Sequence, residues 1–456
     1  MRLRFLPALA MACLLAHSAR ADRLDDAIER EMARRHVPGV AIAVVKDGRI
    51  VRERGYGLAN VEHGVPVTPR TVFQSGSIGK TFTAALVLLL AQDGKLALHD
   101  PVARHLPNVP ASWSGITIRH LLTHTAGLGD PYEVIDLRKD YTDEELLALE
   151  TTIPLLSAPG ERFAYSNLGY HLLGFICTRV GGKFWGDQVR ERIFMPLGMG
   201  ARVISEADIV PHRAAGYRWQ DGQLANQAWV SPSLNRTADG SIHLTAHDLA
   251  LWDRALDDDR ILAAPLRAAS FSAARLADGD HGPYGFGWYV GAQQGRLVSH
   301  GGAWQGFKTV INRYLDDRLT VIVLANSSHA RQGKIADMIA AHYVPALAVV
   351  RAAAIPDDDP AVTARARAAL LQLAAREVPA GLSEAGRQRY TPQWIDNVAR
   401  ELEDAGTLER VELLARSGAG ERRLFRYRFS FSNETLIVAL TLGPDDALER
   451  LGLSLE

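Results

Sequence analysis

The sequence predicts an α+β fold, in which an antiparallel sheet is flanked by helices and carries an inserted helical lobe. Apolar segments with strand character occur at residues 40–57 and again between Tyr284 and residue 326. The stretch between them, about residues 100–280, is mostly helical and rich in loops. The later strands follow one another closely, which favours antiparallel pairing. Strands from both ends can therefore build one sheet around the helical insertion.

The elements of this unit follow in order along the chain. Residues 23–36 read as an opening helix, and residues 40–57 as two strands that turn at Asp47-Gly48. A helix is expected at 81–93, ending at Gly94. Four strands are expected within residues 286–290, 296–300, 308–315 and 319–326.

A second, smaller α+β domain is predicted after the segment "IPDDDP" at residues 355–360. Helices are expected at 361–378 and 392–406, followed by strands at 424–431, 433–442 and 447–455. The predicted domains are residues 22–354 and 355–456. The C-terminal one contains no evident catalytic cluster.

The N-terminus has the pattern of a secretory signal peptide. Arg2 and Arg4 precede a short apolar run, and Ala19 to Ala21 form a small-residue cleavage signal. We expect cleavage after Ala21 and export to the periplasm or the medium. Lipid attachment at Cys13 is a weaker alternative, because the residues before it match a lipidation box poorly.

Composition excludes several classes of function. The chain has 51 basic and 52 acidic residues, a balance that gives no reason to expect nucleic acid or an anionic membrane as partner. After cleavage only Cys177 remains, so no internal disulfide can form. No other run is apolar and long enough to span a membrane.

The stretch "QSGSIGK" places Ser77 and Lys80 three residues apart at the start of an apolar helix. Residues i and i+3 share a helix face, so both side chains should point the same way. A buried lysine tends to lose its proton and can then act as a base toward the serine hydroxyl. The structural alternative is a capping serine followed by a solvated lysine.

Rival catalytic patterns are missing from the sequence. Ser75 stands where the G-x-S-x-G elbow requires glycine, and no H-E-x-x-H motif or cysteine ligand pair occurs. No glycine-rich phosphate loop follows a strand. We therefore expect no metal and no cofactor.

Two later segments could complete a serine hydrolase site. Tyr165-Ser166-Asn167 offers a phenol and an amide on a loop that opens a helix. His300-Gly301-Gly302 ends an apolar strand, where the glycines would let a substrate approach the backbone. Each alone has an ordinary structural reading, as a packed aromatic or a turn.

Together and in this order, the three motifs resemble the penicillin-recognising serine hydrolases. Over residues 25–345 the chain looks most like the branch with class C β-lactamases, D-aminopeptidases, D-Ala-D-Ala carboxypeptidases and related esterases. The resemblance implies that Ser77 forms an acyl-enzyme, that Lys80 and Tyr165 share its proton, and that Asn167 holds Lys80 or a substrate amide. It further implies an oxyanion hole of the backbone N–H groups of Ser77 and Ala303, beside a substrate-binding strand end at His300, Gly301 and Gly302.

The third motif departs from the family pattern. Many relatives carry a lysine where this chain has His300, which is mostly neutral at pH 7. The expected substrates are therefore small esters or D-amino-acid peptides and amides. Weak β-lactam hydrolysis or D-Ala-D-Ala carboxypeptidase activity is the alternative. A catalytically inactive protein that binds cell-wall peptides is an alternative of another class.

Overall fold

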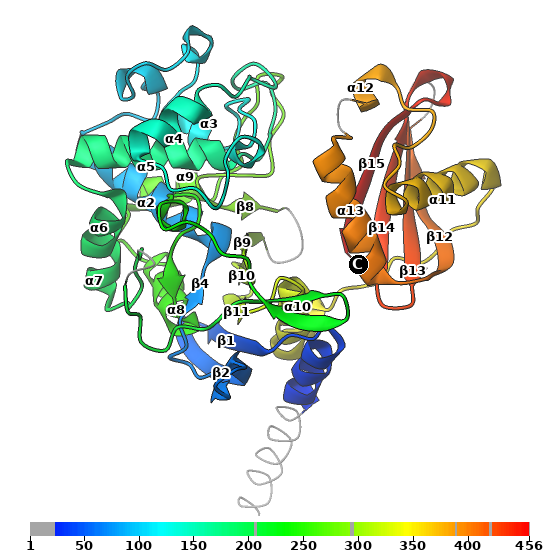
Figure 1. Cartoon of the computed structure of the whole chain (residues 1–456), viewed down its shortest axis with the longest axis horizontal. Coiled ribbons are helices and arrows are strands. Elements are labelled where there is room, and N and C mark those ends of the chain that lie inside the picture. The colour runs from blue at the N-terminus through cyan, green and yellow to red at the C-terminus, as the bar shows by residue number, and fades with distance from the viewer. Residues whose placement is uncertain (1–22, 205–207, 292–295, 388–389, 419–421, 456) are drawn as a thin grey trace, which may run out of the picture. The chain divides into compact units, whose positions relative to one another are not determined.

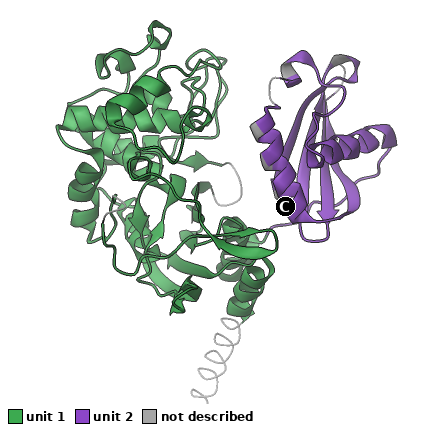
Figure 2. Ribbon diagram, viewed as in Figure 1, with its two compact units in different colours: residues 1–348 green, residues 349–456 purple. Residues whose placement is uncertain are grey.

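The computed structural model describes residues 23–204, 208–291, 296–387, 390–418 and 422–455. The chain forms two compact units, divided between Ala348 and Val349 (Figure 2). The expected signal peptide and Cys13 lie outside the described residues. Within the described ranges, no helix has the length and apolar character needed to cross a membrane.

The first unit is built on a seven-stranded sheet with the strand order β3-β2-β1-β11-β10-β9-β8 (Figure 1). All neighbouring strands are antiparallel, and β1 pairs with β11 so that Val40 lies opposite Ala325. Strands from the two ends of the unit thus meet in the middle of the sheet, which confirms the predicted α+β fold. The strands are β1 (Gly39–Lys46), β2 (Arg49–Asn60), β3 (Val65–Pro66), β8 (Tyr289–Val290), β9 (Leu297–Trp304), β10 (Phe307–Tyr314) and β11 (Leu319–Ala325).

Strand β1 is apolar throughout because both of its faces are covered. Ala41 and Ala43 belong to the core on one face of the sheet, whereas Val40 and Ile42 belong to the core on the other. The strand turns into β2 at Asp47 and Gly48, whose φ angles of 51° and 74° are those a two-residue hairpin requires.

Helices cover both faces of this sheet. The opening helix at residues 23–34 and α10 (Gln332–Tyr343) contribute to one core. Helix α2 (Gly79–Gln92) contributes to the other core and is buried at every position from Gly79 to Leu90. The remaining helices, mostly of the inserted lobe, are α3 (Ile118–Leu122), α4 (Asp143–Glu150), α5 (Asn167–Gly181), α6 (Trp185–Val189), α7 (Met195–Leu197), α8 (Ala246–Ala255) and α9 (Ala264–Ser270). Two short strand pairs accompany them, β4 (Phe73–Gln74) with β7 (His243–Leu244) and β5 (Tyr217–Gln220) with β6 (Gln223–Asn226).

The second unit is a four-stranded antiparallel sheet with its own apolar core. Its elements are α11 (Pro360–Ala374), α12 (Glu384–Arg387), α13 (Pro392–Ala405), β12 (Leu408–Ser417), β13 (Arg423–Phe431), β14 (Thr435–Leu442) and β15 (Leu448–Leu455). The sequence prediction lacks β12. This strand lies at the sheet edge and carries charges at Glu409, Arg410 and Glu412, so its apolar alternation is broken.

The division between the units falls earlier than the boundary at residues 354 and 355 that "IPDDDP" suggests. Ile355 packs against the C-terminal core, and its amide donates to the Leu413 carbonyl at 2.8 Å. Arg428 donates to the Ala352 carbonyl, also at 2.8 Å. Residues 349–355 therefore belong with the second unit.

A chain shortened to residues 22–348 should fold on its own. The seven-stranded sheet and both of its cores lie within these residues. We expect one cooperative thermal transition within about 5 °C of the corresponding transition in the full chain, by circular dichroism. Aggregation of the shortened chain while the full chain stays soluble would mean that the second unit is needed to cover the first.

Candidate active site

Ser77 lies in a short 3₁₀ turn, η1 (Gly76–Ile78), that runs directly into α2, and its side chain is partly exposed. Gly76 has a φ angle of 52°, and a Cβ atom there would lie 2.6 Å from the Ala303 backbone nitrogen. Only glycine allows this contact. It holds the Ser77 segment against β9 and places the amides of Ser77 and Ala303 on neighbouring segments, as an oxyanion site requires.

Lys80 is completely buried and its ammonium group is fully occupied. Its Nζ donates to Ser77 Oγ at 3.0 Å, to Asn167 Oδ1 at 2.8 Å and to the Asp239 carbonyl at 2.7 Å. An ammonium has three protons to donate, and all three are used. The structural alternative of a solvated lysine therefore does not apply.

The surroundings of Lys80 make it easier to deprotonate. Burial lowers its pKa to about 8, although the carboxylates of Asp239 and Asp130 act in the opposite direction. A substantial fraction of the side chain is then neutral just above pH 7. Such an amine, within hydrogen-bond distance of a serine hydroxyl, can accept its proton.

Tyr165 borders the same hydroxyl. Burial raises the pKa of its phenol, and a hydrogen bond to Ser77 opposes this rise. The ring stacks on His124 with a centroid distance of 4.1 Å, and the Lys80 ammonium lies 5.1 Å from its centre. Tyr165 is therefore protonated at neutral pH and is suited to donate rather than to accept a proton.

Asn167 links Lys80 to an acidic residue. It is the first residue of α5, so the helix start fixes its position. Its Oδ1 accepts from Lys80, and its Nδ2 donates to Asp130 Oδ2 at 3.0 Å. Asp130 is partly exposed.

His300 is predicted from the sequence to bind the substrate, and the structure gives the surroundings of its side chain. The side chain is buried, its Nε2 is 2.7 Å from the Tyr284 hydroxyl, and its Nδ1 is 2.6 Å from the Gly301 carbonyl. Burial and the charge of Lys80 lower its pKa to about 3. The ring is a neutral part of the aromatic packing, because the alternating side chains of β9 turn it toward the core.

The two glycines after His300 have different surroundings. A Cβ atom at Gly302 would lie 2.1 Å from the Ser75 carbonyl oxygen, so this glycine permits close packing between β9 and the Ser77 segment. Gly301 is exposed, with no atom closer than 3.8 Å to its Cβ position. Only Gly301 has the open surroundings that the prediction expected of both.

Several charged residues behind Lys80 belong to no recognisable sequence motif. Asp239 accepts from the Tyr132 hydroxyl at 2.9 Å, and its other carboxylate oxygen lies 3.1 Å from His171 Nε2. His171 Nδ1 contacts Glu150. These residues come from distant parts of the chain, and the only sequence signal was a histidine on the otherwise apolar face of α5.

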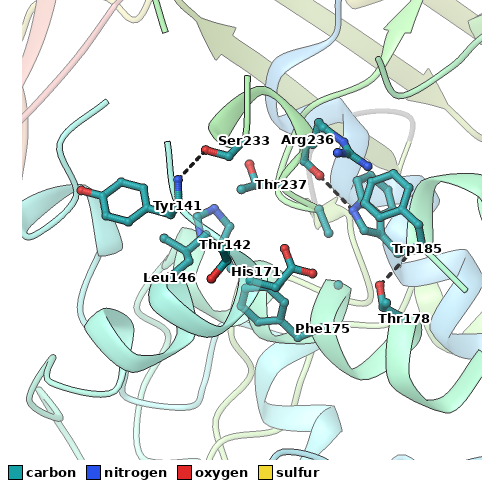
Figure 3. A pocket seen from close by; sticks show the side chains of 14 residues that line it. Tyr141, Thr142, Leu146, His171, Phe175, Thr178, Trp185, Ser233, Arg236 and Thr237 are labelled. Carbon is teal, nitrogen blue, oxygen red and sulfur yellow. Dashed lines mark hydrogen bonds between the residues drawn. The ribbon is translucent and has the colours of Figure 1, made fainter. Parts of the chain in front are cut away.

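A cavity of about 390 Å³ borders this group (Figure 3). One face of α5 lines it with His171, Phe175 and Thr178, opposite Arg236 and Thr237. Ser77 and Lys80 are not among the lining residues. Across the described part of the chain, no cluster of three or more histidine, cysteine or acidic side chains is arranged to hold a metal ion.

Comparison with known proteins matches the chain to one family profile and to individual relatives. The family profile described as Beta-lactamase matches residues 24–344. The chain is 30% identical over 336 residues to Penicillin-binding protein 4* of Bacillus subtilis, covering 69% of this chain and 73% of the relative. It is 31% identical over 330 residues to a D-aminopeptidase of Gluconobacter oxydans, covering 70% of this chain and 61% of the relative, which is less than two thirds of that protein's length.

Among solved structures, a D-amino acid amidase from Ochrobactrum anthropi complexed with L-phenylalanine amide is similar, with a TM-score of 0.59 and 25% identity. The match covers 70% of this chain and 97% of the amidase.

Proposed function

Because the chain belongs to the Beta-lactamase family of serine hydrolases, we propose that it hydrolyses amides and peptides of D-amino acids, and small esters, through an acyl-enzyme on Ser77. The observation that carries this proposal is the buried Lys80 amine, 3.0 Å from the Ser77 hydroxyl. The contact supplies a nucleophile and its base in one hydrogen bond.

The proposed reaction proceeds in two acyl transfers. Ser77 Oγ attacks the substrate carbonyl as its proton passes to neutral Lys80, and the oxyanion accepts hydrogen bonds from the amides of Ser77 and Ala303. Each such donor contributes about 3 kcal/mol in the transition state. Tyr165 donates its proton to the leaving amine or alcohol and recovers one from Lys80. A water molecule then attacks the ester, losing its proton by the reverse route and releasing Ser77.

The charges around the site favour substrates with a free amine. His300 is buried and neutral, so β9 offers no cation for a substrate carboxylate there. Asp130 is partly exposed next to Asn167 and would attract an ammonium group. Aminopeptidase or amidase action therefore fits the site better than carboxypeptidase or β-lactamase action. The names of two similar proteins, a D-aminopeptidase and a D-amino acid amidase, support the same substrate class.

A turnover screen tests this proposal. The panel contains D- and L-aminoacyl amides, a short-chain ester and a chromogenic cephalosporin. We expect faster turnover of D- than of L-aminoacyl amides, and the least turnover of the cephalosporin. Turnover of none of them, with no covalent adduct, would favour the inactive cell-wall peptide-binding protein.

Replacing Asp130 by Asn should raise KM for a D-aminoacyl amide. A unit charge near 4 Å contributes on the order of 1 to 4 kcal/mol, so the rise should be roughly fivefold or more. The same amide with an acetylated amine, and a small ester, serve as controls because they carry no cation. Equal losses on all three substrates would show that Asp130 acts only by holding Asn167.

We also propose that the protein is exported and that its signal peptide is cleaved after Ala21. Expression in a bacterial host with a periplasm should yield a mature chain beginning at Asp22, as measured by N-terminal mass spectrometry. An uncleaved chain in the cytoplasm would contradict it.

A further inference from the structure

A buried row of three ionisable side chains lies behind Lys80. Glu150 ends α4, His171 lies in the second turn of α5, and Asp239 follows the 3₁₀ turn η6 (Leu234–Arg236). The side chains of Glu150 and His171 have no exposed surface, and that of Asp239 is 7% exposed. Three charges removed from water at one place are costly unless they compensate one another.

His171 connects the two carboxylates. Its Nδ1 contacts Glu150 Oε1, and its Nε2 lies 3.1 Å from Asp239 Oδ1. Burial alone would lower the pKa of His171, but Asp239 and Glu150 outweigh burial and raise it to about 10. Burial alone would raise the pKa of Asp239, but His171 and Lys80 hold it well below its usual range. At neutral pH His171 is therefore an imidazolium beside the Asp239 carboxylate. Burial raises the pKa of Glu150, and the neighbouring His171 opposes this rise.

The row reaches Lys80 through one residue. The backbone carbonyl of Asp239 accepts a hydrogen bond from Lys80 Nζ at 2.7 Å, while its carboxylate accepts one from Tyr132 at 2.9 Å. Asp239 thus joins the catalytic amine to the buried imidazolium.

We propose that His171 is a positioning residue for Lys80: its imidazolium, anchored by Glu150, fixes the Asp239 segment to which Lys80 donates and offsets the Asp239 carboxylate beside the catalytic amine. This inference rests on the proposed function, because it assigns a role relative to the base of that reaction. It adds residues that neither touch the substrate nor belong to the three sequence motifs.

Compensation of the Asp239 charge matters because, of the two carboxylates that raise the pKa of Lys80, Asp239 has the larger effect. Asp239 and Asp130 both favour the protonated amine, so an uncompensated Asp239 would keep Lys80 charged to higher pH. The other groups that hydrogen-bond to Lys80, lie against it or are influenced by its charge are Ser77, Asn167, Tyr165, Tyr170, His124 and His300. In the folded protein His124 and His300 are neutral at the pH where Lys80 titrates, since burial and the Lys80 charge lower their pKa values.

Two substitutions that move charge in opposite directions test this role. His171→Gln removes the positive charge, but its amide can still donate to Asp239, and the neighbouring cavity gives the side chain room. Asp239→Asn removes the negative charge and leaves the backbone carbonyl in place. The measurement is kcat/KM for a small ester between about pH 6 and pH 10, in the full chain.

The acid limb is the pH range over which kcat/KM rises as Lys80 loses its proton. We expect this limb to shift to higher pH by about one unit in His171→Gln and to lower pH by about one unit in Asp239→Asn. A residue with only a structural role would lower activity and thermal stability without moving the limb. Limbs unchanged in both folded variants would overturn the proposal, while an inactive unmodified chain would instead overturn the proposed function.

Asp253→Asn is the matched control. Asp253 forms an equally buried ion pair with Arg313, at 2.5 Å, on α8 and β10. Its loss should destabilise the fold and leave the limb in place; a limb shifted as far as in Asp239→Asn would count against the proposal.

If neither variant folds, nitrogen chemical shifts of His171 in the unmodified chain decide the question. An imidazolium that persists at about pH 8 and titrates near 10 supports the proposal. A neutral ring at pH 7 overturns it.

Discussion

Replacing Ser77 by alanine should abolish turnover and covalent labelling while the fold is kept. The change removes one hydroxyl of a partly exposed residue, which hydrogen-bonds to Lys80 and Tyr165. Loss of the nucleophile in a serine hydrolase costs on the order of 10⁴-fold or more in kcat. The measurements are ester hydrolysis and labelling with a fluorophosphonate probe, with the thermal midpoint as evidence of folding.

Ser75→Ala is the matched control for this experiment. Ser75 lies two residues earlier, and its hydroxyl donates only to the backbone carbonyls of Gly76 and Gly240. This variant should be labelled by the probe. Wild-type turnover in Ser77→Ala, or loss of labelling in both variants, would mean that Ser77 is not the acylated group.

Replacing Lys80 should reduce the rate by several orders of magnitude and remove its pH dependence. Lys80 acts in its neutral form, and burial lowers its pKa to about 8. In the unmodified enzyme kcat/KM should therefore rise about tenfold per pH unit below 8 and level off above it. Lys80→Ala should lack this limb, because the titrating group is gone.

Lys80→Arg separates charge from basicity. A guanidinium keeps the positive charge but does not lose its proton in this range. We expect it to be as inactive as the alanine variant. An acid limb near pH 8 that survives in Lys80→Ala would assign the titration to another group.

The contact between Ser77 and Lys80 could be predicted from the sequence because it is local. Ser77 lies in the turn η1 and Lys80 three residues later in α2, which follows it directly. The apolar residues around Lys80 required it to be buried. The single turn of helix fixes the contact, so spacing alone was sufficient. The antiparallel sheet was predictable for a similar reason, since closely spaced strands leave few other pairings.

The electrostatic surroundings of Lys80 could not be predicted in this way. Asp239, His171 and Glu150 meet only after the inserted lobe has folded, and each alone reads as an ordinary polar residue. The position of His300 shows the same limit. The sequence predicted a strand that ends at His300, but β9 continues to Trp304, so His300 lies in its middle. The direction of its ring depends on which face of β9 is covered, and its contact with Tyr284 is long-range.

The most direct test of the account is the mass of an acid-quenched acyl-enzyme. The full chain is mixed with a D-aminoacyl ester, quenched with acid, digested and mapped by peptide mass spectrometry. The account predicts one adduct, of the mass of the D-aminoacyl group, on the peptide that contains Ser77, and its absence in Ser77→Ala. An adduct on a different residue, or turnover of the ester with no adduct under conditions that trap a slow intermediate, would contradict it.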